Sequence, residues 1–505
     1  MKEKKNIKIS YIIYIAAFLL ISLVPLFTFS DSQAAIGNET RADKPKLSDG
    51  ISFTQNADSY FAQNFGFRNR LVYAGNAIKQ AVFKTSGQAE VIIGEDGWLF
   101  YESALADYTG TNDMIRLELE KAAVILKMMQ SYVEHKGGQF IFFSAPNKMS
   151  VYGEYMPYYY LDSGRNGNYE RLYSELVGSG VNTVQLKNVL ALEKLGGIQL
   201  YHKLDSHWNS YGAAVAYEAV AQTLLEAYGE EYAGYTRYSE LPYSIVNNFS
   251  GDLQSMLLPG SAVRDEQVVF DVDEEFEYTG RFKGVDDLLI TTQNTNAAVD
   301  KSVTLFRDSF GNALYWFFAN DYEVLSAKRE VPYNIYRAAD ESELVVVELV
   351  ERNLKNLLHY TPVIPSWNLG EDFLKEAGIS LSDSTSEGQQ SCDAVMGITT
   401  TADGLVQISG SCEGVAGAAD IYLAGAADAG KDLVDRDSKS FGDGGSEQYF
   451  VYRLMPCEGE EDFMLYLEPG DDAVPDCLAD RGQFCLIVER QGVYEKITIN
   501  VTLQD

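Results

Sequence analysis

The sequence predicts an α/β protein built on a doubly wound parallel sheet, with a membrane anchor before it and an all-β domain after it. Helix-type and strand-type segments alternate at the lengths of βα units between residues 51 and 380. The first thirty residues contain a long apolar run, and residues 391–505 contain short strand-like runs between Gly- and Asp-rich turns. A chain of 505 residues is also too long for one ordinary core, so several domains are expected.

The first thirty residues have the composition of a signal anchor. Four lysines within residues 2–8 precede an uncharged run over residues 9–30. An apolar stretch of that length spans a bilayer as a helix, and a basic flank favours the cytoplasmic side. The sequence therefore predicts a single-pass transmembrane helix at the plasma membrane, with the bulk of the chain extracytoplasmic. The alternative is a secreted protein, because Ser32-Gln33-Ala34 could serve as a signal-peptide cleavage site.

Charge and composition restrict the possible partners. The chain carries a formal net charge of −33. Binding of a polyanion needs clustered Lys and Arg side chains that neutralise phosphates, so nucleic acid is not an expected partner. Residues 31–50 are polar and are predicted to form a linker between the anchor and the folded part.

Apolar spacing places the elements of the central region, residues 51–380. Helical spacing is found in residues 51–85, 113–135, 168–177, 210–228 and 310–320. Strand-type runs cover residues 139–144, 181–186, 288–292, 302–306, 323–327 and 344–350, and a hairpin is predicted over residues 91–101. Ser210 is a plausible N-cap of the fourth helical segment, and Gly229 follows its end. This alternation predicts parallel strands with helices on both faces of the sheet.

The last quarter of the chain has a different pattern. After a polar linker over residues 381–390, strand-like runs cover residues 405–408, 420–423, 449–454, 463–467, 484–488 and 497–503. No convincing helix accompanies them, and the pattern predicts an all-β sandwich over residues 391–505. All five cysteines lie here, and their odd number leaves at least one thiol unpaired within the chain. The absence of a Cys-x-x-Cys spacing argues against a zinc ribbon.

Three residues of the central region have the chemistry of a nucleophilic site. Asp205 and His207 lie two positions apart on a loop before a predicted helix, in a chain with only four histidines. Ser309 lies at a turn between a predicted strand and a predicted helix. A serine hydroxyl needs an adjacent imidazole to take its proton, and the imidazole needs a carboxylate to fix its tautomer. The sequence therefore predicts that Asp205, His207 and Ser309 form a catalytic triad.

Two other interpretations of the Asp205 segment stay open. It could be an ordinary helix entry, with Asp205 as a turn residue and Trp208 in the core. His202, Asp205 and His207 also fit a His-x-x-Asp-x-His pattern for zinc. Three ligands on one short loop without a second cluster make a poor zinc site, and Lys203 would repel a cation. We therefore predict no metal.

The order of several short motifs resembles one protein family. The segments are residues 97–101 (Gly-Trp-Leu-Phe-Tyr), 146–148 (Pro-Asn-Lys) with Tyr152 and Pro157, 205–209 (Asp-Ser-His-Trp-Asn) with Gly212, 307–310 (Arg-Asp-Ser-Phe), 347–348 (Val-Glu) and 351–352 (Glu-Arg). In this order they resemble the SGNH-hydrolase-like polysaccharide O-acetyltransferases of the alginate O-acetylation type (AlgJ and AlgX), also called DHHW proteins. The likeness covers about residues 50–360 and does not extend to the C-terminal domain.

The resemblance implies an SGNH-hydrolase-like fold in which Asp205 is the acid, His207 the base and Ser309 the nucleophile. It also implies a cell-surface polysaccharide as acetyl acceptor and a membrane-bound partner of the MBOAT type that passes acetyl groups outward, with no cofactor. Two positions depart from the family pattern. Ser206 stands where Thr or His is more usual, which we expect to be harmless, and Asn147 stands where the family has Asp, which leaves its role open.

The sequence also suggests residues that contact the substrate. The candidates are Trp208, Asn147, Arg307 and Arg352. Either arginine could orient a substrate or form an ion pair instead. The expected function is an O-acetyltransferase that moves acetyl groups onto hydroxyls of a cell-surface or secreted polysaccharide through a serine acyl-enzyme. The alternatives are an acetylesterase on the same substrates and a non-catalytic surface protein that binds carbohydrate.

Overall fold

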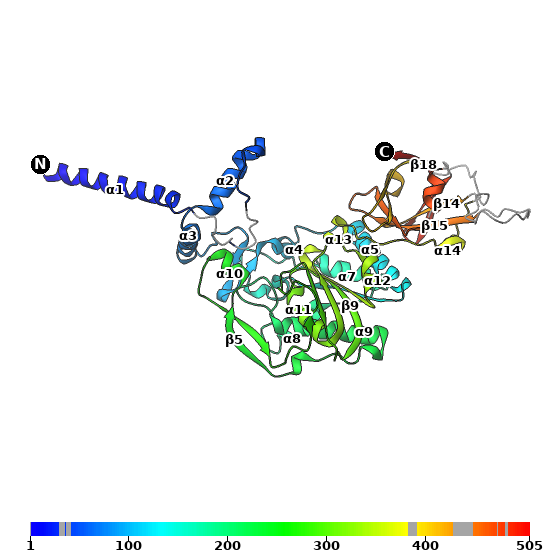
Figure 1. Ribbon diagram of the computed structural model, residues 1–505, viewed down its shortest axis with the longest axis horizontal. Helices are drawn as coiled ribbons and strands as arrows, with labels where there is room; N and C mark the ends of the chain where they lie inside the picture. The colour runs from blue at the N-terminus through cyan, green and yellow to red at the C-terminus, as the bar shows by residue number, and fades with distance from the viewer. Residues whose placement is uncertain are drawn as a thin grey trace, which may run out of the picture.

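A computed structural model describes residues 2–29, 36, 42–381, 391–427, 448–471, 473–479 and 483–504. An α/β domain forms the centre of the molecule, the N-terminal helices extend from one side of it, and a β-barrel packs at the other (Figure 1). The predicted linker over residues 381–390 lies outside the described residues except for Leu381. Half of the predicted linker over residues 31–50, namely residues 31–35 and 37–41, is likewise outside them.

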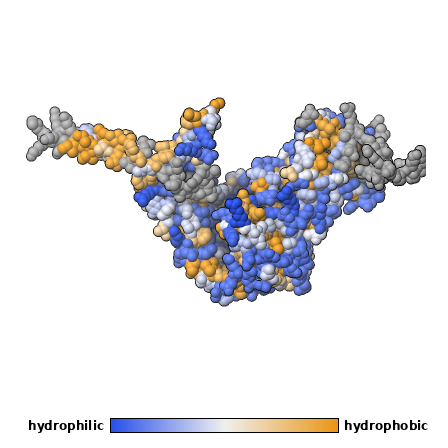
Figure 2. Space-filling view, in the orientation of Figure 1, coloured by the Kyte–Doolittle hydropathy of each residue, from blue (hydrophilic) through white to orange (hydrophobic). Residues whose placement is uncertain are grey.

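The N-terminal segment is helical. Its elements are α1 (Lys2–Phe27), the 3₁₀ helix η1 (Leu47–Ser52), α2 (Phe53–Asn64) and α3 (Arg68–Phe83). Figure 2 shows apolar residues along the visible face of α1, where Ile12, Tyr14 and Phe18 are exposed. Within the described part of the chain, no helix has both the length and the apolar character needed to cross a membrane. The structure therefore does not support the predicted transmembrane helix.

The central sheet has seven strands in the order β4-β3-β11-β9-β10-β8-β7. They are β3 (Gln139–Ala145), β4 (Thr183–Val184), β7 (Glu277–Tyr278), β8 (Leu289–Gln293), β9 (Val299–Phe306), β10 (Tyr322–Lys328) and β11 (Leu344–Val350). The first five strands in the sheet order are parallel, as predicted, whereas β8 and β7 add an antiparallel edge. The predicted hairpin is also present, as β1 (Val91–Ile93) and β2 (Leu99–Tyr101).

Helices cover both faces of this sheet. One face carries α5 (Arg116–His135), α7 (Asn168–Ser179) and α12 (Ile335–Glu341), and the other carries α8 (Leu186–Lys194), α9 (Ser210–Tyr228) and α11 (Gly311–Asp321). Successive residues of β3 point to opposite faces of the sheet. Phe140 and Phe142 therefore pack in the core beneath α5, α7 and α12, whereas Ile141 and Phe143 pack in the core beneath α8, α9 and α11. Strands that are buried on both faces need continuous apolar runs, and this is why their sequences lack a polar alternation. The doubly wound prediction is confirmed.

One segment between α9 and β8 was not predicted. It contains the hairpin of β5 (Tyr243–Phe249) and β6 (Asp265–Phe270), with the short helix α10 (Asp252–Leu257) between its strands. The N-cap of α9 also differs from the prediction, because the Asn209 side chain, and not Ser210, accepts a hydrogen bond from the Gly212 N–H at 2.9 Å. An Asn side chain satisfies an otherwise unpaired N–H at a helix start.

The C-terminal domain is a closed barrel, so the predicted sandwich is wrong. Its strands are β12 (Ser391–Thr400), β13 (Val406–Cys412), β14 (Asp420–Ala427), β15 (Gln448–Pro456), β16 (Asp462–Leu467), β17 (Phe484–Arg490) and β18 (Val493–Gln504). The first strand, β12, pairs in parallel with the last, β18, and this pairing closes the sheet. A helix that was not expected, α15 (Ala473–Ala479), contributes Val474 and Leu478 to the barrel core.

The barrel packs against α5 of the α/β domain. Lys121 of α5 is 2% exposed, and its ammonium donates to the carbonyl oxygens of Cys457 at 2.9 Å and Gly459 at 2.7 Å. The Tyr132 hydroxyl donates to Glu468 at 2.7 Å. Buried polar groups at such an interface are tolerated only when they are hydrogen-bonded, so these bonds fix where the barrel sits.

We expect Lys121→Met to lower the free energy of unfolding by about 2–3 kcal/mol, because two buried carbonyls lose a charged donor. Urea denaturation measures the change. Lys127→Met on the same helix is the control, since the Lys127 ammonium makes one long, exposed contact with Gly180 at 3.4 Å. Equal effects of the two substitutions would contradict the role given to Lys121.

Candidate active site

The loop from Tyr201 to Trp208 is closed on itself at the entrance to α9. Tyr201 and Trp208 form an isolated antiparallel bridge, and the His202 N–H donates to the His207 carbonyl at 3.2 Å. The Leu204 N–H donates to the Asp265 carboxylate of β6 at 2.6 Å. These bonds satisfy the backbone of a tight loop and hold its side chains in fixed directions.

Asp205 is the buried anion of this loop, with 4% exposure. Its Oδ1 accepts from His207 Nδ1 at 2.7 Å and from the His207 backbone N–H at 2.9 Å, and its Oδ2 accepts from the Asp252 N–H at 2.8 Å. Burial alone would raise the pKa of Asp205, but the charge of His207 and these hydrogen bonds outweigh it and hold the pKa well below its usual value.

His207 connects Asp205 to the predicted nucleophile. His207 Nε2 lies 2.8 Å from the Ser309 Oγ. Because an ionised carboxylate only accepts hydrogen bonds, Nδ1 carries the ring proton and Nε2 is left to accept the Ser309 hydroxyl. Burial tends to lower the pKa of His207, but the charge of Asp205 outweighs it and the pKa is raised. The three residues predicted from the sequence are therefore in continuous hydrogen-bond contact.

Ser309 lies at the turn between the end of β9 and the start of α11. The Asp308 carboxylate holds this turn, accepting from the Phe310 N–H and the Val350 N–H at 2.8 Å each. Gly311 is required by close packing, because a Cβ there would lie 2.4 Å from the Arg307 Cβ. The turn is thus set by local chain geometry and places the Ser309 hydroxyl at the carboxyl edge of the parallel strands.

Trp208 joins the base loop to the nucleophile turn. Its indole N–H donates to the Phe310 carbonyl at 2.9 Å, and the Phe310 ring packs edge-on against Trp208 and His207 at centroid distances of 5.1 and 4.9 Å. Trp208 is 1% exposed. The structure therefore gives this predicted substrate-binding residue a positioning role beside the nucleophile.

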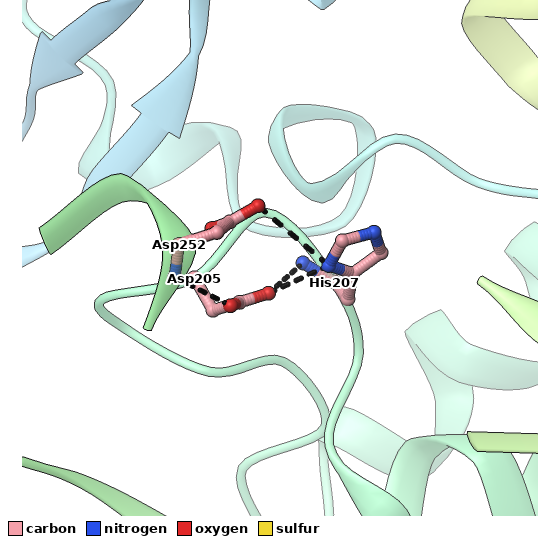
Figure 3. Close-up of side chains that lie close together, drawn as sticks. All are labelled: Asp205, His207 and Asp252. Atoms are coloured by element: carbon pink, nitrogen blue, oxygen red, sulfur yellow. Dashed lines mark hydrogen bonds and ion pairs between the residues drawn. The ribbon is translucent and has the colours of Figure 1, made fainter. Parts of the chain in front are cut away.

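Asp252 is a member of the site that the sequence did not reveal. It lies at the first position of α10, where its carboxylate accepts from the Ser206 N–H at 2.8 Å and the Ser206 hydroxyl at 2.6 Å. Figure 3 shows both carboxylates on the Nδ1 side of the imidazole, with the Asp252 oxygen 3.8 Å from Nδ1. Burial and the neighbouring Asp205 charge raise the pKa of Asp252 to about 6.

The geometry does not assemble the metal site that His202, Asp205 and His207 could have formed. His202 Nδ1 lies 2.9 Å from the Glu266 carbonyl, and its ring stacks on Phe249 at 3.9 Å. In the described part of the chain, Asp205, His207 and Asp252 are a group whose ligand atoms lie within 4.8 Å of one another. Their oxygens and Nδ1 already serve one another and Ser206 as hydrogen-bond partners. The expectation of no metal stays a prediction.

Lys148 supports the Asp205 loop from behind. Its ammonium donates to three carbonyl oxygens, those of Leu99 at 2.6 Å, Lys203 at 2.9 Å and Asp205 at 2.8 Å. The side chain is 4% exposed. Burial lowers the pKa of Lys148 to about 7 against the raising effect of Asp205. The Pro-Asn-Lys segment quoted from the sequence pointed to this residue without showing its role.

The other predicted substrate-binding residues differ in placement. Arg352 lines the cleft beside Ser309, where its guanidinium lies 5.5 Å from the Phe310 ring centroid. Asn147 is fully buried and contacts Asp107 and Arg352. Arg307 is 3% exposed and donates to the Asp287 carbonyl at 2.9 Å. Neither Asn147 nor Arg307 lines the cleft, so their placement does not support the predicted substrate contacts.

A cleft of about 1000 Å³ opens over the Ser309 hydroxyl. One wall is the nucleophile turn and the exposed face of α11, and the opposite wall is the β5–β6 hairpin with the segment that follows it. The unpredicted hairpin is thus what turns the edge of the sheet into a cleft. Its depth suits a ligand that lies across the edge of the sheet.

The comparison with known families covers the domain that holds this cleft. Residues 91–321 match the family model described as "SGNH hydrolase-like domain, acetyltransferase AlgX". This region is an SGNH hydrolase-like domain of the AlgX acetyltransferase family. The match contains Asp205, His207, Asp252 and Ser309, whereas Arg352 and the barrel lie beyond it.

Individual relatives are distant from this chain. It is 22% identical over 215 residues to the probable alginate O-acetylase AlgJ of Pseudomonas fluorescens, covering 43% of this chain and 52% of the relative. It is 26% identical over 138 residues to the same-named protein of Pseudomonas putida, covering 27% and 34%. The chain thus spans about half, or less, of the length of the curated relatives it matches.

The solved structures that are similar to this chain have low sequence identity to it. The O-acetyltransferase domain of Pseudomonas putida AlgJ is 18% identical with a TM-score of 0.36, and covers 52% of this chain and 92% of that chain. Bacillus cereus PatB1 with a sulfonyl adduct is 16% identical with a TM-score of 0.43, and covers 53% and 97%.

We expect Lys148→Met to lower the free energy of unfolding by about 2–4 kcal/mol, because three buried carbonyls lose a charged donor. Amide hydrogen exchange should show faster exchange in residues 201–208 before the whole domain opens. Lys203→Met is the control, since that side chain is only partly buried. Unchanged exchange in the loop of the Lys148 variant would refute the supporting role.

We expect Asp252→Asn to lower the pKa of His207, because it removes a negative charge that favours the imidazolium. A base must be neutral to act, so the acidic limb of the pH–rate profile for an activated ester should move to lower pH. NMR titration of the His207 ring measures the pKa directly. A limb that stays in place or moves upward would contradict this assignment.

Proposed function

We propose that the protein is an O-acetyltransferase that moves acetyl groups onto hydroxyls of a polysaccharide through an acetyl ester on Ser309. The observation that carries the proposal is the unbroken hydrogen-bond line from Asp205 through His207 to Ser309 at the floor of an open cleft. The AlgX-type family match and the AlgJ relatives named alginate O-acetylases support acetyl transfer to a polysaccharide.

In the first half-reaction, His207 Nε2 takes the hydroxyl proton as Ser309 Oγ attacks the acetyl carbonyl of the donor. The Asp205 and Asp252 carboxylates, both on the Nδ1 side of the ring, stabilise the charge of the imidazolium that forms. Collapse of the tetrahedral intermediate releases the donor group, and His207 returns the proton to it. Ser309 is left as an acetyl ester.

In the second half-reaction, an acceptor hydroxyl in the cleft gives its proton to His207 and attacks the acetyl ester. The Ser309 oxygen then leaves and takes the proton back. The intermediate of each half-reaction carries a negative oxygen. The start of α11 directly after Ser309 and the Arg352 guanidinium at the cleft wall supply the positive potential that such an oxygen needs.

The acetyl donor and the membrane are separate parts of the proposal. We propose that a membrane-bound partner of the MBOAT type supplies acetyl groups and that α1 attaches the protein to the plasma membrane, with the bulk extracytoplasmic. The exposed apolar residues of α1, such as Ile12 and Phe18, support attachment. The full chain should then co-sediment with liposomes and lose binding when residues 1–30 are deleted. Equal sedimentation of both forms would reject this attachment.

We expect the full chain to gain the mass of one acetyl group after incubation with an activated acetyl ester such as p-nitrophenyl acetate. Ser309→Ala should abolish the adduct, and His207→Ala should slow its formation on the order of 100- to 10,000-fold because the general base is lost. Intact-mass spectrometry follows the adduct. Ser163→Ala, which changes a half-buried serine outside the cleft lining, is the control.

The same experiment separates the alternatives. Faster loss of the adduct when an oligosaccharide is added, with acetyl found on the sugar, identifies a transferase. Loss of the adduct to water alone identifies an acetylesterase. An adduct that persists in Ser309→Ala, or none in the unaltered protein, would reject the acyl-enzyme and favour a binding protein.

A further inference from the structure

The cleft beside Ser309 is walled by aromatic rings from several elements. They include Tyr101, Phe249, Phe270, Phe310, Tyr315 and Trp316. Trp316 is half-exposed on α11, and its indole N–H donates to Glu274 at 3.3 Å across the cleft mouth. Ring faces in an open cleft suit the apolar faces of sugar rings, because stacking buries C–H surface while the hydroxyls stay in water.

The distance from Ser309 to Trp316 fits a chain of sugars. Trp316 lies five residues beyond Gly311, the first residue of α11, which corresponds to about 8 Å along the helix axis, and Ser309 precedes that start. A sugar that stacks on Trp316 therefore lies beyond the one that presents its hydroxyl to the acetyl ester. The cleft can hold several units of a polymer rather than one free sugar, in keeping with its volume of about 1000 Å³.

Charge is the second feature of the cleft. Apart from histidines, its ionisable lining consists of four carboxylates, Asp205, Asp252, Glu274 and Asp286, against two guanidinium groups, Arg329 and Arg352. Arg329 is already paired with Asp286 at 3.6 Å. The Arg352 charge lies near His207, at the reacting end. No unpaired cation of the described lining therefore remains along the part of the cleft that would hold the rest of a polymer.

The rim adds further negative charge. The segment after β6 has the sequence Asp-Val-Asp-Glu-Glu-Phe-Glu over residues 271–277, and its five acidic side chains are exposed. Val272 and Glu274 of this segment line the cleft. With a net charge of −33 on the whole chain, the field at the entrance opposes an anionic ligand.

We propose that the acetyl acceptor is a polysaccharide without acidic groups, bound by stacking on Trp316 and its neighbouring rings, and not a polyuronate. Beyond the sugar at the reacting end, where Arg352 lies, a polymer with one carboxylate per sugar would bring each charge into a part of the cleft whose described lining offers no unpaired cation. This inference rests on the proposed acetyl transfer. It narrows the acceptor to uncharged glycans, a class that the alginate relatives do not suggest.

The experiment starts from the full chain acetylated on Ser309 with an activated ester, so that the first half-reaction is established before any acceptor is added. Cellohexaose or chitohexaose, both neutral, is compared with a mannuronate hexamer at low ionic strength. We expect the better neutral hexamer to speed loss of the acetyl group at least tenfold more than the uronate. Equal rates, or a faster reaction with the uronate, would overturn the inference.

Failure of the proposed function gives a different result, because no Ser309 adduct would form in the first place.

The salt dependence of the two rates supplies an internal check. Added salt shortens the distance over which charges act on one another. The rate with the uronate should therefore rise relative to the rate with the neutral hexamer as ionic strength rises. Discrimination that is independent of salt would speak against an electrostatic origin.

Two sets of variants test the named residues. Trp316→Ala should raise the acceptor KM about tenfold with little change in kcat and none in adduct formation, and Trp316→Tyr should restore most of the affinity. Tyr158→Ala removes an exposed ring outside the cleft lining and should change neither constant. Asp273→Asn combined with Glu274→Gln should reduce the difference in the rate of acetyl loss between the neutral and the uronate hexamers. An unchanged KM in Trp316→Ala would reject the stacking site.

A second inference concerns two thiols of the barrel. Cys392 of β12 and Cys412 at the end of β13 lie with their sulfur atoms 2.7 Å apart. That separation is inside ordinary contact between two sulfurs and approaches the covalent distance of about 2.05 Å. Cys392 is partly exposed, so an oxidant can reach it, whereas Cys412 is buried.

We infer that Cys392 and Cys412 form a disulfide under oxidising conditions. The two thiols lose two protons and two electrons to a disulfide oxidant such as oxidised glutathione, which is released as two molecules of reduced glutathione. The bond would tie the barrel's first strand to its neighbour next to the β12–β18 closure. It closes a short loop, and such a cross-link restricts the unfolded chain.

Treatment of the full chain with oxidised glutathione should remove two hydrogens in mass and give a cross-linked peptide that contains Cys392 and Cys412. The melting temperature of the barrel should rise by several degrees and fall back with reductant. Cys392→Ser should lose both effects, and Cys485→Ser should keep both. Complete alkylation of Cys392 and Cys412 after the oxidant would overturn the inference.

Discussion

The buried carboxylate of Asp205 is the constraint on which the site depends. A charge removed from water is costly unless every oxygen finds a donor, and here the donors are the His207 ring and the backbone N–H groups of His207 and Asp252. Each donor comes with a structural demand. The His207 N–H reaches the carboxylate only if the loop is tight, and the Asp252 N–H reaches it only if α10 begins beside it. The Lys148 ammonium in addition binds the Asp205 carbonyl. The anion thus fixes the loop and the start of α10, and Lys148 holds the same residue through its backbone carbonyl.

The parallel sheet explains why residues 102 positions apart meet at this anion. Strands β3, β9 and β11 all end at one edge. Lys148 follows β3, Ser309 follows β9 and Arg352 follows β11. The carboxyl ends of three neighbouring strands thus place the lysine that holds the Asp205 loop, the candidate nucleophile and a cation at one edge. Helices on both faces leave this edge as the place where loops can gather. The β5–β6 hairpin then adds the far wall.

The sequence was informative where structure is local. Apolar runs placed the strands, and the residue types at Asp205, His207 and Ser309 identified the hydrogen-bonded line, because a serine, an imidazole and a carboxylate have few other joint uses. Asp252 escaped prediction because it begins a short helix inside a segment without clear periodicity. The closed barrel depends on pairing between β12 and β18, which no local pattern encodes. Arg307 lies outside the cleft lining, because its guanidinium is held by the Asp287 carbonyl, a contact distant in sequence that no local pattern indicates.

The hydrogen bond from the Trp208 indole to the Phe310 carbonyl matters most in the middle of the proposed acetyl transfer. In the resting site two bonds join the base loop to the nucleophile turn, and the other is the Ser309 hydroxyl to His207. An esterified serine has no proton to donate, so that second bond vanishes once the acetyl group is in place. The indole bond does not involve the hydroxyl and survives. Among the described residues, the Trp208 indole then makes the remaining hydrogen bond between the base loop and the nucleophile turn, and it would hold the imidazole in place until the proposed acceptor binds.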